Sequence, residues 1–118
     1  MEDTSAVDAL SALAHPGRLA VFRLLVRAGP EGLAAGAVAR AMATPANTMS
    51  TQLAILARAG LVQARRDSRS MIYAADYSHI TALLGFLMED CCDGRPEICA
   101  PLAATATCRL APTAAPTP

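Results

Sequence analysis

Residues 44–60 read TPANTMSTQLAILARAG, and this stretch decides the fold. Thr44 is a residue type that caps helix N-termini, and Pro45 suits the first helical position. Large apolar side chains then recur at helical spacing, at Met49, Leu53 and Leu56. Gly60 is the residue type that commonly follows a helix C-terminus. The stretch therefore predicts an amphipathic helix over residues 45–59.

The face of this helix opposite the apolar stripe carries polar side chains that can form hydrogen bonds. They are Asn47, Thr48, Ser50, Thr51, Gln52 and Arg58, with Gln52 nearest the buried edge. Asn and Gln can pair with adenine in a major groove, Ser and Thr contact several bases, and a helix N-terminus attracts phosphate. Every solvent-exposed helix has a polar face, so the neighbouring elements decide whether this one reads DNA.

The spacing of apolar residues predicts further helices over residues 5–14, 16–28, 33–42 and 76–92. The helices over 33–42 and 45–59, joined by a tight turn, form a helix–turn–helix. Residues 61–75 change to a period of two around a polar tip, which predicts a β-hairpin. Its arginines, Arg65, Arg66 and Arg69, suit contacts with phosphate or a minor groove. We therefore predict a mainly α (α+β) winged helix–turn–helix with the hairpin as its wing.

The composition fits one small DNA-binding domain. The 118 residues are 53% hydrophobic but only 3% aromatic, which favours helices with small side chains over a β-sandwich. The net charge is zero, yet residues 32–75 hold five arginines and one acid, and residues 76–99 hold five acids and one arginine. This split offers DNA a basic surface on a neutral molecule. We expect a folded domain over residues 1–99 and a disordered Ala-, Thr- and Pro-rich tail over residues 100–118.

The sequence contains no run of about 18 apolar residues and no basic, then apolar, secretory signal at its start. We expect a cytoplasmic protein without a membrane partner, in which the four cysteines stay reduced. The sequence pairs no cysteine with histidine and aspartate in a catalytic pattern, and it has no Gly-rich phosphate loop. Neither an enzyme nor an organic cofactor is expected.

Three stretches resemble the ArsR/SmtB family of metalloregulatory repressors. They are LAHPGRLAVFRLL at 13–25, MSTQLAILARAGLV at 49–62 and RRDSRSMIY at 65–73. The resemblance implies an α-rich winged helix, a homodimer formed through the first and last helices, and repression of the protein's own operon. It also implies that Ser50 and Gln52 face bases. The two-fold symmetry of such a dimer predicts an inverted repeat as its double-stranded DNA operator. Ser68 departs from the family, which commonly carries glycine there.

A second functional signal is the segment CCDGRPEIC at residues 91–99. Cys91 and Cys92 fall where the last predicted helix ends, and a following glycine and proline favour a turn that returns Cys99 to them. Three soft thiols without a nearby histidine suit a thiophilic centre. Trivalent arsenic binds three sulfurs in a pyramid, whereas zinc prefers four ligands in a tetrahedron. We predict that Cys91, Cys92 and Cys99 bind trivalent arsenic as the inducer.

The family comparison places this site away from the family's usual positions. Well-known arsenic sites of the family use a Cys-x-Cys before the recognition helix, but residues 36–42 contain no cysteine. Zinc sites of the family pair Asp with His and His with Glu on the last helix. Here His79 has the wrong spacing for such a pair and is more typical of a surface residue. The vicinal pair plus a third cysteine resembles an arsenite-responsive subgroup whose site lies at the end of the last helix.

Other interpretations of these residues stay open. Cys91 continues the apolar stripe and suits a buried structural thiol, and Cys92 with Cys99 suits a redox or persulfide switch. Cys108 would complete a zinc site but fits a bystander in the tail, and His15 fits a helix cap. The leading function is a repressor released by arsenite or methylarsenite. The alternatives are a thiol redox-sensing repressor on the same scaffold and a helical thiol module that does not bind DNA.

Overall fold

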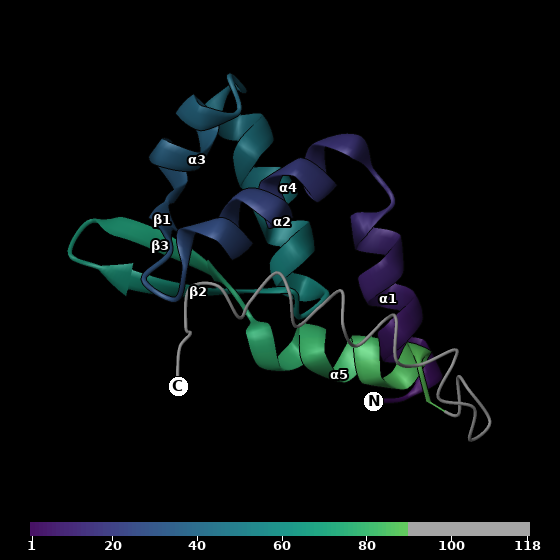
Figure 1. The fold of residues 1–118 in the computed structure, drawn as a ribbon. Helices are drawn as coiled ribbons and strands as arrows, with labels where there is room; N and C mark the ends of the chain where they lie inside the picture. Colours follow the sequence, from purple (N-terminus) through teal and green to yellow (C-terminus); the bar gives the residue numbers. More distant parts are fainter. Residues whose placement is uncertain (90–118) are drawn as a thin grey trace. The chain divides into compact units, whose positions relative to one another are not determined.

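The computed structural model describes residues 1–89, so the cysteine segment and the tail lie outside the described residues. The helices are α1 (Asp3–Leu13), α2 (Pro16–Ala28), α3 (Ala35–Ala41), α4 (Ala46–Arg58) and α5 (Tyr77–Leu87). The strands are β1 (Leu33–Ala34), β2 (Val62–Asp67) and β3 (Ser70–Ala75). Helices α3 and α4 form the predicted helix–turn–helix, and the β2–β3 hairpin is the wing (Figure 1). The predicted winged helix–turn–helix fold is confirmed.

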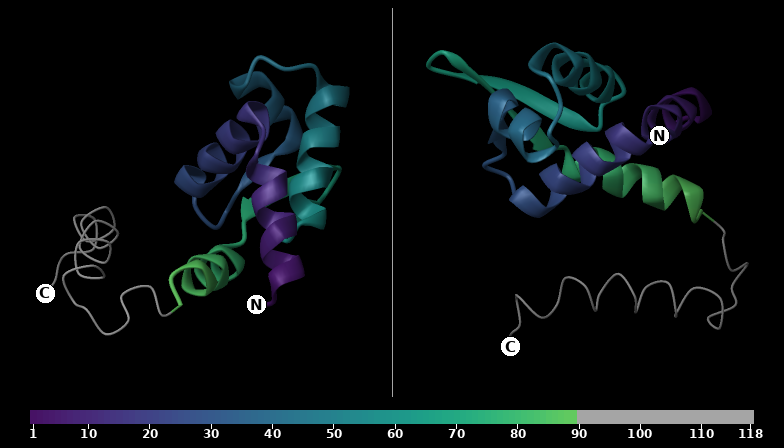
Figure 2. Two further views of the ribbon diagram at one scale, coloured as in Figure 1. Left: turned by 90° about the vertical axis from the view of Figure 1, so that its right-hand side faces the viewer. Right: turned by 90° about the horizontal axis from the view of Figure 1, so that it is seen from above.

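The sheet has one strand more than the hairpin that the sequence predicted. Its order is β1-β3-β2, and every neighbouring pair is antiparallel. Leu33 and Ala34 pair with Tyr73 and Ile72 of β3, so the helix predicted over 33–42 begins only at Ala35. The prediction was wrong at its start because the pairing partners of Leu33 and Ala34 lie 40 and 38 residues further along the chain. Figure 2 shows the hairpin reaching beyond the helices.

The core lies where α2, α3 and α4 meet the inner end of the hairpin. Its most completely buried large side chains are Leu25, Met49, Leu53, Leu56, Leu61, Val21 and Val38. Burying each of these stabilises the fold by about 1.5–3 kcal/mol relative to exposure. Helix α2 contributes one face to this core. It buries Val21, Phe22 and Leu25, whereas Leu19 and Val26 remain exposed.

Helix α1 buries its alanines and exposes its larger apolar side chains. Ala6, Ala9 and Ala12 face the core, while Val7 is 61% and Leu10 42% exposed. Small alanine side chains let the backbone of α1 approach the core closely. The larger apolar side chains of α1 therefore remain partly exposed on the surface of this one chain.

Among residues 1–89, no single helix is both long enough and apolar enough to cross a membrane. In the same part of the chain, α1 and α2 taken together meet the required length and composition, with a bend of 101° between them.

Candidate nucleic-acid interface

Helix α4 is amphipathic in the way the sequence predicts. Met49, Leu53 and Leu56 are at most 2% exposed, and they hold the helix against the core. The start of the helix differs from the prediction. Pro45 is the N-cap residue and the helix begins at Ala46, without a side-chain cap from Thr44. The Thr44 hydroxyl instead donates to the carbonyl oxygen of Met42 at 3.0 Å, so it closes the end of α3.

The first two turns of α4 present a polar, solvent-exposed face. It consists of Asn47, Thr48, Ser50 and Thr51, all exposed. The Asn47 side-chain oxygen accepts a hydrogen bond from the Thr48 backbone N–H at 2.9 Å, and the Thr51 hydroxyl donates to the Asn47 carbonyl at 3.2 Å. These local bonds order the side chains without burying them. The face therefore keeps donors and acceptors available to a ligand.

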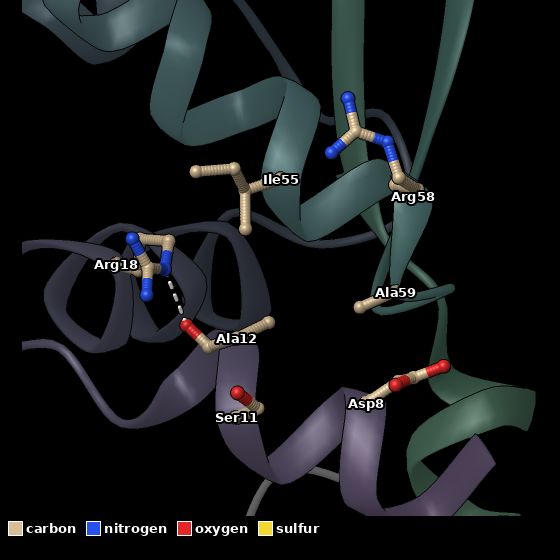
Figure 3. Close-up of a pocket in the computed structure, with 7 residues that line it drawn as sticks. All are labelled: Asp8, Ser11, Ala12, Arg18, Ile55, Arg58 and Ala59. Atoms are coloured by element: carbon tan, nitrogen blue, oxygen red, sulfur yellow. Dashed lines mark hydrogen bonds between the residues drawn. The ribbon is translucent and has the colours of Figure 1, made fainter. Parts of the chain in front are cut away.

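Arg58 lies at the other end of α4 from this face. It comes eleven positions after Asn47, which corresponds to about 16 Å along a helix. Figure 3 shows its side chain directed away from Asp8 and Ser11 of α1. It borders a surface hollow of about 270 Å³ between α1 and α4, whose other lining residues are Asp8, Ser11, Ala12, Arg18, Ile55 and Ala59. If the N-terminus of α4 contacts bases, Arg58 would therefore contact the DNA backbone some distance away from those bases.

Gln52, the remaining predicted contact on α4, is held by another residue of the chain. It is half-buried, and its side-chain oxygen accepts a hydrogen bond from Nη1 of Arg18 at 3.2 Å. Arg18 also donates from Nε to the carbonyl oxygen of Ala12 at 2.6 Å (Figure 3). Sequence reasoning missed Arg18, since nothing in its spacing shows that the start of α2 packs against α4.

The wing does not present its three arginines as one cluster. Side chains alternate along a strand, so Arg66 shares a face with the core residue Val62, and Arg65 lies on the opposite face. Arg65 donates from Nη2 to the carbonyl oxygen of Glu31 at 2.9 Å, which ties β2 to the loop before β1. Arg69 lies in the two-residue turn between the strands and is exposed. Arg66 and Arg69 are thus the more available cations of the hairpin.

The turn itself has an uncommon backbone conformation. Ser68 has a φ of 60°, and Arg69 after it does not have a positive φ. A positive φ at the first loop residue alone is the sign pattern of a type II′ turn, which favours glycine there. The departure at Ser68 noted in the sequence therefore falls at the position where glycine would fit best.

Asp76 joins the base of the wing to the start of α5. Its carboxylate accepts hydrogen bonds from the Ser78 hydroxyl at 2.7 Å, the Gln63 amide at 2.9 Å and the His79 backbone N–H at 3.0 Å. The Ser78 and Gln63 hydrogen bonds are the main cause that lowers the pKa of Asp76 below its usual value near 3.8. The carboxylate stays ionised at neutral pH and links β2 to the first turn of α5.

The two histidines have different surroundings. His15 caps α2, because its Nδ1 accepts hydrogen bonds from the backbone N–H groups of Gly17 and Arg18 at 3.1 and 3.3 Å. His79 packs against Gly60, and its Nε2 has no hydrogen-bond partner among residues 1–89. In this same part of the chain, no group of three or more His, Cys, Asp and Glu side chains could hold a metal ion. The predicted ligands Cys91, Cys92 and Cys99 lie outside the described residues.

The known proteins to which this chain is similar include regulators of transcription. The profile of a helix–turn–helix domain family matches residues 13–63. A helix–turn–helix-type transcriptional regulator of Mycobacterium tuberculosis is 39% identical over 75 residues, which are 61% of each chain. The chain thus spans less than two thirds of the length of this relative.

Two solved structures share the fold over most of their length. One is the homodimeric winged helix–turn–helix DNA-binding domain of a possible ArsR-family regulator from Mycobacterium bovis. It has a TM-score of 0.59 and 26% identity, over 76% of this chain and 89% of that one. The other is a possible transcriptional regulator for arsenical resistance, with a TM-score of 0.60 and 28% identity, over 68% of this chain and 80% of that one.

Proposed function

Because the chain contains a helix–turn–helix domain and has the winged fold of a possible ArsR-family regulator, we propose that it is a DNA-binding transcriptional repressor. The observation that carries the proposal is the exposed polar face on the first two turns of α4, backed by the buried stripe of the same helix. Side chains of this kind read base edges when a helix N-terminus enters a major groove. Arg66 and Arg69 would contact the adjacent phosphates.

The test is binding to double-stranded DNA from upstream of the protein's own gene, followed by fluorescence anisotropy. Ser50→Ala should weaken binding to the preferred sequence by about 5- to 160-fold, since a lost base contact costs on the order of 1–3 kcal/mol. Arg23→Ala on α2 serves as the control for a surface substitution away from α4. Absence of any DNA binding by the intact protein would favour a helical thiol module instead.

We further propose that the repressor is a homodimer formed through its first and last helices. Val7 and Leu10 on α1 and Leu84 on α5 are exposed, with Leu84 at 56%. Covering such side chains contributes about 25 cal/mol per Å² of apolar area. The Mycobacterium bovis domain, which has the same fold, is homodimeric. A second copy of this chain is therefore the occupant that fits the exposed apolar side chains.

Light scattering after size-exclusion chromatography tests the dimer. Leu10→Glu should yield a monomer, because a charge would be buried in the interface. Leu19→Glu is the matched control, since Leu19 on α2 is 44% exposed and belongs to neither proposed interface helix. A dimer that survives Leu10→Glu, or is lost equally in both variants, contradicts the assignment.

The inducer that we propose is trivalent arsenic, as arsenite held by Cys91, Cys92 and Cys99 or as methylarsenite held by two of these three thiols. Each thiol replaces one hydroxide on arsenite, so an As–S bond forms as an As–O bond breaks and the thiol proton leaves with the hydroxide as water. The product carries no net charge and needs no cationic partner. Support comes from the three-thiol spacing in the sequence and from the fold shared with a possible regulator for arsenical resistance.

Titration of the protein–DNA complex with arsenite, methylarsenite, zinc and hydrogen peroxide, in parallel, separates the possible signals. Arsenicals should release the DNA, and Cys91→Ser, Cys92→Ser and Cys99→Ser should each lose the arsenite response. Cys108→Ser is the matched control and should keep it. A response that survives in all three variants would overturn the site, and release by peroxide alone would favour the redox-sensing repressor.

A further inference from the structure

Helix α5 carries no charged side chain on the side that faces solvent. Its sequence, YSHITALLGFL, contains no arginine, lysine, aspartate or glutamate. Leu83 is buried in the core, with Ile80 and Phe86 partly buried beside it. A helix that lies at a protein surface normally carries charged residues on its outer side, whereas a helix without them is covered there as well. The composition of α5 therefore indicates that its outer side has a partner.

Gly85 lies near the middle of this outer side. It comes two residues after Leu83, so it is about 160° away from Leu83 around the helix axis. A Cβ added at Gly85 would meet no atom of the described residues within 4 Å. Thr81, one turn earlier on the same side, is also exposed. At Gly85 the backbone of α5 is thus open to close approach.

Nothing in the described part of the chain requires glycine at this position. Gly85 does not have a positive φ, and two residues of α5 follow it, so it does not serve to end the helix. No neighbouring side chain would exclude a methyl group there. Glycine within a helix is nevertheless less favourable than alanine, by a factor of about five in the helix-forming equilibrium. A reason for glycine has to come from a neighbour that approaches the backbone from outside.

A second copy of this chain is the neighbour that fits. Leu84, next to Gly85, is 56% exposed and belongs to the surface already assigned to the dimer. Gly85 continues that surface, and the Mycobacterium bovis domain of the same fold is homodimeric. Packed helices have their axes about 8–10 Å apart, depending on the side chains at the contact. A glycine at the contact permits the short end of that range.

We propose that Gly85 is the point at which a helix of the second copy comes closest to α5, so that the dimer requires a residue without a side chain there. The inference rests on the proposed homodimer and names its contact point. It predicts that one substitution has opposite effects on the single chain and on the dimer.

The test is Gly85→Ala in the full-length protein. Sedimentation equilibrium should show a dimer dissociation constant about 5- to 160-fold higher, because an added methyl group overpacks a close contact. The same substitution in the monomeric Leu10→Glu background should raise the folding equilibrium constant by up to about fivefold in urea denaturation. If Leu10→Glu does not fold, the stability is measured at protein concentrations below the dissociation constant of the dimer.

Gly36→Ala is the matched control. Gly36 is an exposed glycine in α3, which belongs to neither proposed interface helix, and its new methyl group would lie 3.4 Å from Nη1 of the flexible Arg40 side chain. This variant should leave the dimer dissociation constant unchanged. An equal weakening of the dimer in Gly36→Ala and Gly85→Ala would overturn the assignment of the contact point.

A dimer that is unchanged or tighter in Gly85→Ala would overturn the inference and leave the proposed homodimer intact. A loss of stability in the monomeric background would also overturn it, because the space beside Gly85 would then be filled by residues of the same chain. If the intact protein is a monomer at every concentration, the proposed homodimer fails and this inference fails with it.

Discussion

The two adjacent arginines of β2 should contribute unequally to DNA binding. Arg66 and Arg65 carry the same charge on the same strand, but they lie on opposite faces of the hairpin. Arg65 already donates to the carbonyl oxygen of Glu31 at 2.9 Å, whereas Arg66 shares the face of Val62, against which the core and α4 pack. Arg66→Ala should therefore remove a phosphate contact, and Arg65→Ala serves as its charge-matched control.

The size of the effect follows from counterion release. Each phosphate contact contributes about 0.9 to the slope of log K against log salt concentration, so two copies of Arg66 in a dimer contribute about 1.8. Between 50 and 200 mM salt, a slope of that size corresponds to an affinity change of about 12-fold. Arg66→Ala should thus weaken binding about 12-fold more at the low salt concentration than at the high one. Arg65→Ala should change the slope by less than about half as much.

Fluorescence anisotropy of a labelled duplex, measured at several salt concentrations between those two, provides the assay. Arg66→Lys should keep most of the slope, because a lysine also neutralises phosphate. The loss should be the same on preferred and unrelated sequences, since phosphate contacts do not read bases. Equal slope changes in Arg65→Ala and Arg66→Ala, or a larger one in Arg65→Ala, would refute the assignment of the two faces.

Three substitutions test the stability of the wing. Ser68→Gly should raise the free energy of unfolding by about 1 kcal/mol in urea denaturation, because it relieves a positive φ of 60°; a loss of stability would contradict the turn geometry. Gly32→Ala should lower it by more than about 1 kcal/mol, since φ is 73° and the new methyl group would meet the Tyr73 carbonyl oxygen. Asp76→Asn should lower the free energy of unfolding at neutral pH. The difference between the variant and the unsubstituted protein should vanish as the pH falls through the lowered pKa of Asp76, because protonation of Asp76 removes the same interaction. A difference that persists in thermal melts at low pH would contradict that origin.

Much of the fold could be predicted because its strongest elements have regular periods. The stripe of Met49, Leu53 and Leu56 is buried as its spacing indicates, and the hairpin follows the change to a period of two. Strand β1 could not be predicted in this way. It consists of two residues, and it exists because Leu33 and Ala34 meet β3 across the sheet. A two-residue strand has no periodicity, and tertiary pairing overrides the helical tendency of its alanine.

The direction in which an apolar helix face points was also beyond sequence reasoning. In α1 the spacing of Val7, Leu10 and Leu13 predicts a helix correctly, yet the buried stripe is Ala6, Ala9 and Ala12. Both stripes have helical spacing, and hydrophobicity alone favours the larger side chains for the core. The difference matters for function, because apolar side chains that stay exposed on α1 form a surface that a second subunit can cover.

For the candidate interface, sequence reasoning identified the polar positions but not which of them are already committed within the chain. Gln52 and Arg65 look like Ser50 and Arg66 in the sequence, but Gln52 bonds to Arg18 and Arg65 bonds to Glu31. Ser50 and Arg66 are exposed and have no such bond among residues 1–89. Substituting a committed residue removes an internal hydrogen bond as well as any contact with DNA, so its effect on binding includes a change in folding stability. Substituting an exposed one changes binding alone. Measuring the melting temperature and the DNA affinity of variants at these four positions therefore separates residues that support the fold from residues that contact DNA. This distinction depends on contacts between α2, the loop before β1 and the wing. Those elements lie far apart in the sequence, so no short stretch of sequence reveals it.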